Sequence, residues 1–222
     1  MLLVSRFPLA SLVLAACLAS PAWSATVDVV SGPPTGGTPI ALTVGDFDRL
    51  GNCGGGGSVV GDGCSAIVKT DPAAPDAYGR FDPLGDYWID SQDINELKWT
   101  VTSPDAFTSL TFALTDAHDQ LDSFFTMSFD DGGSWTPIWD IATRKDNANL
   151  YWLSVDFGEA VSEAVFLFST KVEPGYDGYG ISALSVQSPA PIPAPPAVLL
   201  LGSGAVLIAG LRRSNKRPAT PS

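Results

Sequence analysis

The segment Phe124–Trp139, FFTMSFDDGGSWTPIW, has the features of two short β-strands joined by a tight turn. Aromatic and other apolar residues alternate with polar residues before the turn, as expected for a half-buried pleated surface. Asp131-Gly132-Gly133 supplies residue types that turns favour, and the alternation resumes at Thr136. The segment therefore predicts an antiparallel β-hairpin.

Short alternating segments of this kind continue through residues 25–188. Turn signals such as Gly32-Pro33-Pro34 and Ser103-Pro104-Asp105 separate them, and none has a long helical period. The predicted strands are Thr26–Val30, Ile40–Val44, Ala66–Lys69, Tyr87–Ile89, Glu96–Thr102, Ser109–Thr115, Ser123–Phe129, Thr136–Ile141, Tyr151–Phe157, Ala164–Ser169 and Tyr179–Val186. Residues 45–86 are rich in Gly, Pro and Asp and are predicted to be mainly loop. The pattern predicts an all-β domain, an antiparallel β-sandwich of jelly-roll type.

The predicted domain at residues 25–188 is strongly acidic. It holds seven Lys and Arg residues against 24 Asp and Glu residues, a net charge of −17. A surface of this charge repels phosphate backbones, so nucleic acid is not expected as a partner. The charge suits an extracellular domain or one that binds divalent cations, and a solvated acidic surface is the simpler interpretation.

Residues 1–24 have the composition of a secretory signal peptide, which predicts a short signal helix. The apolar segment Leu9–Leu18 follows a basic residue, and Ala22-Trp23-Ser24 offers small residues for cleavage before residue 25. Leu14-Ala15-Ala16-Cys17 also fits a lipobox, in which Cys17 would be lipidated. Ordinary signal cleavage fits better, because the cysteine lies inside the apolar segment and a good cleavage site follows it.

The C-terminal tail has three parts: a Pro-rich linker at 189–196, an uncharged apolar run at Ala197–Leu211 and a basic end at 212–222. Fifteen residues make a helix of roughly 22 Å, whereas the hydrocarbon core of a bilayer is about 30 Å thick. The run therefore predicts a transmembrane or sorting helix that is only marginally anchored. The basic residues after it are expected to stay cytoplasmic, which places the domain on the outer side. A buried core helix is the alternative, but no element follows the run that could cover it.

The tail resembles a PEP-CTERM sorting signal of the VPLPA type. The resemblance covers about the last 30 residues and rests on the apolar run together with Pro191, Ile192, Pro193, Ala194, Arg212 and Arg213. It implies recognition by an exosortase-like membrane peptidase and a transient stay in the inner membrane. It further implies release to, or attachment at, the cell surface of a Gram-negative bacterium that makes exopolysaccharide.

Within the hairpin, Ser128–Trp135 resembles an Asp-box, S-x-D-x-G-x-x-W. In such a turn a short Asp side chain accepts hydrogen bonds from backbone amides, and glycine takes positive φ. The sialidase-like propellers that carry this motif contain several copies. This chain has one copy and no blade-length repeat, so the motif predicts a turn rather than a glycosidase.

Cys53 and Cys64 are the cysteines that remain after signal cleavage, and they flank a Gly-rich segment. In an exported protein such a pair predicts a disulfide. Two cysteines without a nearby histidine are too few for a zinc site.

Acidic residues gather around Tyr87-Trp88-Ile89 and before the last strand. Oxygen ligands from loop aspartates suit calcium, so the sequence indicates one calcium site as the only cofactor it could support. Its candidate ligands are Asp82, Asp86, Asp90, Asp93 and Asp177. The alternative is that these are solvated loop acids, and the spacing is not that of an EF-hand.

Trp88 and Tyr176 are candidate glycan contacts, because each lies beside an acidic loop and aromatic rings stack on sugars. The alternative is that these rings pack in the core or over turns.

The sequence singles out no catalytic residue. His118 is the only histidine, and no serine lies in a nucleophile elbow that could pair with it. The prediction is thus an exported, non-enzymatic protein of the cell surface or biofilm matrix, adhesive or glycan-binding, with exopolysaccharide as a partner. The alternative is a carbohydrate-active hydrolase or lyase that uses two carboxylates on a jelly-roll scaffold.

Overall fold

The computed structural model describes residues 25–33, 35–53, 65–70, 75–121, 123–170 and 177–189. In these ranges the chain forms antiparallel strands and one short 3-10 helix, η1 (Val44–Asp46). The strands are β1 (Thr26–Val30), β2 (Thr38–Pro39), β3 (Phe47–Arg49), β4 (Ile67–Lys69), β5 (Trp88–Asp90), β6 (Glu96–Thr115), β7 (Phe125–Asp130), β8 (Trp135–Ile141), β9 (Leu150–Thr170) and β10 (Gly180–Gln187). The prediction of an all-β antiparallel domain is confirmed.

The predicted signal peptide, the predicted sorting motif, the apolar run and the basic end all lie outside the described residues. Within the described ranges, no helix is long and apolar enough to cross a membrane.

The strands form one sheet in the order β4-β5-β10-β6-β9-β7-β8, with β1 added on β9, β2 on β10 and β3 on β6. Strands β6 and β9 hold this sheet together, because they pair with each other from Glu96–Ser169 at one end to Thr115–Leu150 at the other. Their register shifts between Thr102 and Phe107 and again before Ser109. A shift of this kind bends a strand pair and increases its local twist.

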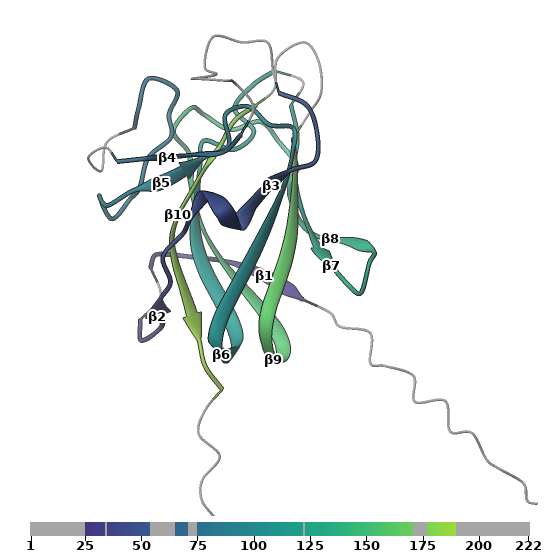
Figure 1. The fold of residues 1–222 in the computed structure, drawn as a ribbon. Helices are drawn as coiled ribbons and strands as arrows, with labels where there is room; N and C mark the ends of the chain where they lie inside the picture. The colour runs from purple at the N-terminus through teal and green to yellow at the C-terminus, as the bar shows by residue number, and fades with distance from the viewer. Residues whose placement is uncertain are drawn as a thin grey trace, which may run out of the picture.

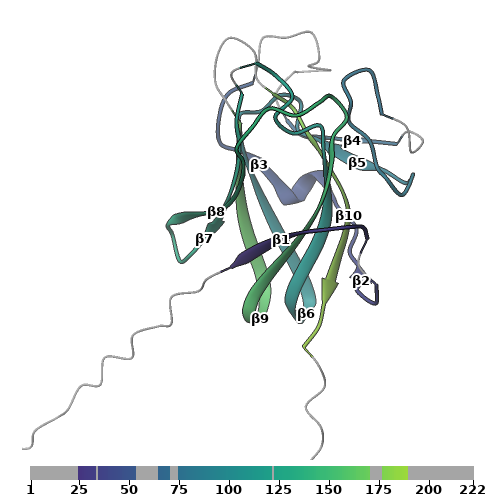
Figure 2. The ribbon, with the colours of Figure 1, turned by 180° about the vertical axis from the view of Figure 1, so that it is seen from behind.

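The bend folds the sheet into two layers. On one side of it β6 pairs with β3 and β9 pairs with β7; on the other side β6 pairs with β10 and β9 pairs with β1. Figures 1 and 2 show both long strands turning back at the same end of the molecule. The two halves of each strand thus belong to opposite layers of a sandwich.

The core fills the space between the two layers. Trp99 and Phe112 belong to the same strand, yet their rings meet edge to face with centroids 5.1 Å apart, because the bend lies between them. Phe125 of one layer meets Tyr179, which precedes β10 of the other, at 5.1 Å. These side chains are fully buried. Burial of such large rings supplies much of the apolar surface that stabilises the fold.

The predicted hairpin is confirmed as β7 and β8. The Oδ1 atom of Asp130 accepts a hydrogen bond from the backbone N–H of Gly133 at 2.6 Å. Gly132 and Gly133 have φ of +68° and +102°, conformations that favour glycine. The Asp-box segment therefore forms the turn between β7 and β8, as predicted from its residues.

Several strand boundaries differ from the prediction. Two pairs of predicted strands are in fact single strands, since β6 continues through Ser103-Pro104-Asp105 and β9 through Gly158. The strand predicted at Ile40–Val44 is wrong. Residues 40–43 belong to no strand or helix and η1 begins at Val44, where the Asp46 side chain accepts a hydrogen bond from the Thr43 backbone N–H at 2.9 Å. Strand β3 lies inside the segment predicted to be loop.

Candidate functional site

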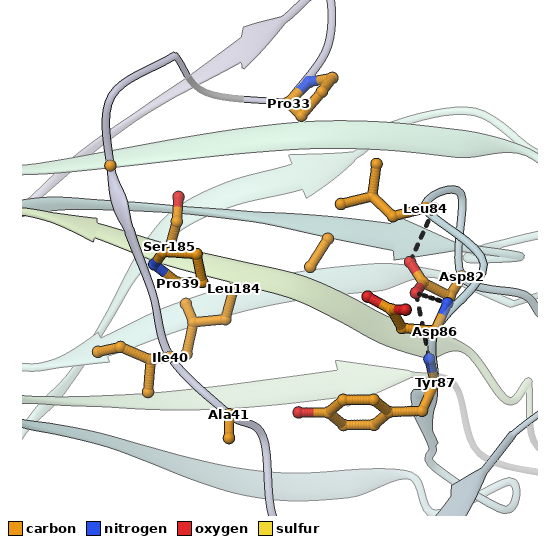
Figure 3. A pocket seen from close by; sticks show the side chains of 12 residues that line it. Pro33, Pro39, Ile40, Ala41, Asp82, Leu84, Asp86, Tyr87, Leu184 and Ser185 are labelled. Atoms are coloured by element: carbon orange, nitrogen blue, oxygen red, sulfur yellow. Dashed lines mark hydrogen bonds between the residues drawn. The ribbon is translucent and has the colours of Figure 1, made fainter.

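A groove of about 400 Å³ lies where β2 and the end of β10 meet the turn at residues 82–87 (Figure 3). We call it the Tyr87 groove; its walls are formed by Pro33, Gly37, Pro39, Ile40, Ala41, Asp82, Leu84, Asp86, Tyr87, Ala183, Leu184 and Ser185. Most of the lining is apolar, and two carboxylates stand on one wall. This is the composition of small-molecule sites, in which a few polar groups fix the orientation of the ligand.

Asp82 shapes the wall of the groove. Its Oδ1 atom accepts a hydrogen bond from the backbone N–H of Leu84 at 3.0 Å. Its Oδ2 atom accepts from the N–H groups of Asp86 at 2.7 Å and Tyr87 at 3.2 Å (Figure 3). A short side chain that binds the backbone ahead of it fixes a turn. The turn leaves Leu84 and Asp86 exposed at the groove.

Tyr87 and Asp86 have polar groups free to meet a ligand. The Tyr87 hydroxyl accepts a hydrogen bond from the backbone N–H of Leu42 at 2.8 Å, so its own O–H proton is not used in that contact. The Asp86 carboxylate makes no ion pair or side-chain hydrogen bond within the part of the chain that the structure describes. The wall therefore offers both a donor and an acceptor.

A bulge in β10 shapes the floor of the groove. The register shifts between Ser182 and Ser185, and Ala183 has φ of +54°. The Ser185 hydroxyl is buried and has no hydrogen-bond partner in the described residues. A Cβ atom at Gly37 would lie 3.0 Å from this hydroxyl, which is a tight contact. Bulges commonly re-aim side chains beside functional sites.

The second feature of this region is a buried ion network around Arg80, just before the turn. The guanidinium binds Asp90 through Nη1 at 2.7 Å and Asp93 through Nη2 at 2.6 Å, and its Nε lies 3.8 Å from Asp116. Lys69 adds a contact to Asp90 at 3.0 Å. Burial opposes the charge of Arg80, but the surrounding carboxylates raise its pKa.

Gly178 is part of the same packing. A Cβ atom there would lie 2.0 Å from Nη2 of Arg80 and 2.4 Å from Oδ1 of Asp93. Gln92, Asp93 and Asp116 adopt positive φ close to the network. Strain of this kind persists only where the surrounding contacts hold it in place.

Two further carboxyl groups at this end of the sandwich are buried and have raised pKa values. Burial raises the pKa of Asp116 to about 8, although the backbone N–H of Ala148 donates to it at 3.0 Å. Burial, followed by the neighbouring Asp119 side chain, raises the pKa of Asp177 to about 7. Its Oδ2 accepts from the Asp119 backbone N–H at 3.0 Å. Both side chains are only 2% exposed, and neither lines the Tyr87 groove.

The five predicted calcium ligands do not come together. Asp82 binds the turn, Asp90 and Asp93 bind Arg80, and Asp177 binds the loop at Asp119. Asp86 faces the groove. No group of three or more His, Cys, Asp or Glu residues that could hold a metal ion occurs in the described ranges. The calcium prediction is therefore wrong for this set: the cation at the centre of the acidic cluster is the Arg80 guanidinium.

The prediction that Trp88 contacts a glycan is also wrong. Strand β5 is covered on both faces, and Trp88 is fully buried. Tyr176 lies outside the described residues, so its role stays a prediction. The same holds for the disulfide, because Cys64 lies outside the described residues. His118 is buried, and its Nδ1 lies 2.8 Å from the Ser123 hydroxyl.

Sequence reasoning missed Arg80 and the groove. Arg80 contacts aspartates that lie 10, 13 and 36 positions further along the chain, and no local sequence pattern predicts such contacts. Two groove residues, Asp82 and Asp86, were predicted as functional, but as metal ligands. The signal that could have found the groove is the adjacency of Asp86 and Tyr87 in a turn.

No protein-family model and no curated protein matches this chain. Among solved structures, a glycoside hydrolase family 43 arabinoxylan arabinofuranohydrolase from Bacillus subtilis matches at a TM-score of 0.35 and 11% identity. That match covers 56% of this chain and only 25% of the hydrolase. A carbohydrate-binding module specific for non-crystalline cellulose, CBM28, matches at 0.34 and 8% identity, with 72% and 97% of the two chains covered. A family 29 carbohydrate-binding module variant matches at 0.33 and 14%, with 74% and 94% covered. All three TM-scores are below 0.5, so these matches assign no function to this chain.

The fold and the groove together define an antiparallel β-sandwich with a mostly apolar groove beside β2 and β10.

Proposed function

We propose that this chain is an exported, non-enzymatic, jelly-roll-like protein of the cell surface or extracellular matrix that binds a glycan in the Tyr87 groove. The groove is the observation that carries the proposal. A sugar ring has an apolar C–H face and a rim of hydroxyl groups. The apolar walls of the Tyr87 groove suit the C–H face of the ring. The Asp86 carboxylate and the Tyr87 hydroxyl can form hydrogen bonds with its hydroxyl groups.

The volume of about 400 Å³ supports a ligand of small-molecule size, such as one or two sugar units of a longer polymer. The groove is open and lies beside β2, so a polymer could continue beyond it. Binding in an open groove needs no closing loop, which agrees with a static adhesive role.

A non-enzymatic role is supported by the positions of the acids with raised pKa. A glycoside hydrolase needs two carboxyl groups that flank the scissile bond. Asp116 and Asp177 are both buried and accept hydrogen bonds from backbone N–H groups, and neither lines the groove. Asp82 also lines the groove, but it accepts hydrogen bonds from three backbone N–H groups that fix the turn, so Asp86 is the wall carboxylate with no side-chain hydrogen bond in the described residues.

Replacing Asp86 with alanine is expected to weaken glycan binding by about tenfold or more, because hydrogen bonds to a charged group contribute roughly 1.5–3 kcal/mol. A glycan array with the purified full chain would select the ligand, and titration calorimetry would measure the loss. Asp140→Ala serves as the matched control, since Asp140 is exposed on β8 and does not line the groove. If no glycan binds, or if both variants bind like the parent chain, the groove is not a glycan site.

We further propose that the tail delivers the domain to the cell surface through an exosortase-like peptidase. The three-part composition of residues 189–222 supports this, as does the marginal length of the apolar run. A chain ending at Gln187 is expected to appear free in the periplasm or medium, while the full chain is found in the inner membrane and at the surface. Fractionation followed by immunoblotting measures this. Identical distributions of the two chains would show that the tail is not a sorting device.

A further inference from the structure

We propose that the Tyr87 groove selects a cationic amino sugar, that is, a glycan whose hexosamine units carry free ammonium groups. The inference rests on the proposed function and adds the chemical class of the ligand. It follows from the charge of the groove wall, from the engagement of the neighbouring cations elsewhere, and from an unpartnered buried hydroxyl in the floor.

The charge of the groove wall is negative and uncompensated. Among the described residues, Asp82 and Asp86 both line the groove and no Lys, Arg or His residue does. Figure 3 shows the two carboxylates side by side on the same wall. Asp82 keeps its acceptor role because three backbone N–H groups point at it.

The cations near this wall in sequence are engaged elsewhere. Arg80 directs its guanidinium at Asp90 and Asp93, and Lys69 binds Asp76 and Asp90. Neither is placed to neutralise Asp86. An unpaired carboxylate beside a second one attracts a positive charge and repels a negative one. The net charge of −17 for residues 25–188 acts in the same direction.

The apolar part of the groove excludes a bare metal ion as the preferred occupant. Leu84, Ile40 and Leu184 offer no oxygen ligand from their side chains. An amino sugar suits both the apolar lining and the carboxylate wall, because its ring packs on the lining while its ammonium group meets Asp86. The Ser185 hydroxyl, which is buried and has no hydrogen-bond partner in the described residues, also lines the groove. A uronic acid would bring its carboxylate against Asp82 and Asp86.

The test compares three oligosaccharide probes of equal length on the purified full chain: de-N-acetylated glucosamine, N-acetylglucosamine and galacturonate. Titration calorimetry is done at low ionic strength and at a pH where the amine is protonated. The de-N-acetylated probe is expected to bind about fivefold more tightly than the acetylated one, the effect of one exposed ion pair. The advantage should disappear at about 1 M salt, where charges are screened within a few ångströms.

Variants separate charge from shape. Asp86→Asn is expected to remove the preference for the de-N-acetylated probe, while the Kd of the acetylated probe stays within about twofold of the parent value. Asp140→Asn should keep the preference for the de-N-acetylated probe. Equal binding of the acetylated and de-N-acetylated probes would overturn the inference and leave glycan binding intact. Absence of binding to every glycan on the array would instead reject the proposed function. If a lysine-rich peptide displaces the amino sugar at equal concentration, the groove selects ammonium groups on peptides and the inference fails.

Discussion

Replacing Arg80 with methionine is expected to lower the free energy of unfolding by about 3–5 kcal/mol, because it leaves buried carboxylates without their cation. Asp90, Asp93 and Asp116 all face the guanidinium and are at most 7% exposed. Methionine fills a similar volume, so the loss would reflect charge rather than a cavity. Urea unfolding of the full chain, followed by tryptophan fluorescence, measures the difference.

The matched control is Lys98→Met. Lys98 pairs with Asp48 at 2.7 Å, but the two side chains are 31% and 61% exposed, so the expected loss is below about 1 kcal/mol. Adding Asp93→Asn to Arg80→Met should recover part of the stability, since it removes the buried charge that Nη2 of Arg80 binds, whereas Asp90 keeps Lys69 as a partner. An Arg80→Met protein as stable as Lys98→Met would mean that the network contributes no net stability.

Replacing Trp99 with alanine is expected to cost about 3–5 kcal/mol, the usual range for truncating a buried aromatic ring. Trp99 stacks on Phe47 at 5.6 Å and on Phe168 at 5.9 Å, and it meets Phe112 of the opposite layer. Its loss would open a cavity between the layers that neighbouring rings cannot fill without leaving their own contacts. Thermal unfolding monitored by circular dichroism would register the change.

Trp135→Ala is the comparison for Trp99→Ala. Trp135 lies at the start of β8 and is 39% exposed, so its truncation should change stability by less than about 1 kcal/mol. Losses of similar size in the two variants would contradict the placement of Trp99 at the centre of the core.

The sequence predicts the strands well where the alternation is strong. Strands β1, β4, β7 and β8 were placed to within one or two residues, because their turns are set by Gly, Pro and Asp. The joining of Glu96–Thr102 to Ser109–Thr115 was missed, since Ser103-Pro104-Asp105 carries a turn signal. In the structure these residues form the bend between the layers, where the register of the β6–β9 pairing shifts but the pairing continues.

The site was less predictable, for a physical reason. Trp88 was assigned to a surface because acidic residues flank it, but β5 is covered on both faces and Asp90 is neutralised by Arg80. Burial of a charge depends on partners that are distant in sequence, and residue type alone does not reveal them. Asp86 and Tyr87 form a wall only because β2 and the β10 bulge lie opposite.

The passage of β6 and β9 through both layers has a consequence for how the domain assembles. Each layer has outer strands of its own, but both layers share β6 and β9, so the two layers are not separate hydrogen-bonded units. Most of the pairings join segments far apart in the chain, a topology that folds slowly. Because the two layers share these two strands, we expect their backbone amides to exchange with solvent in one cooperative step rather than layer by layer.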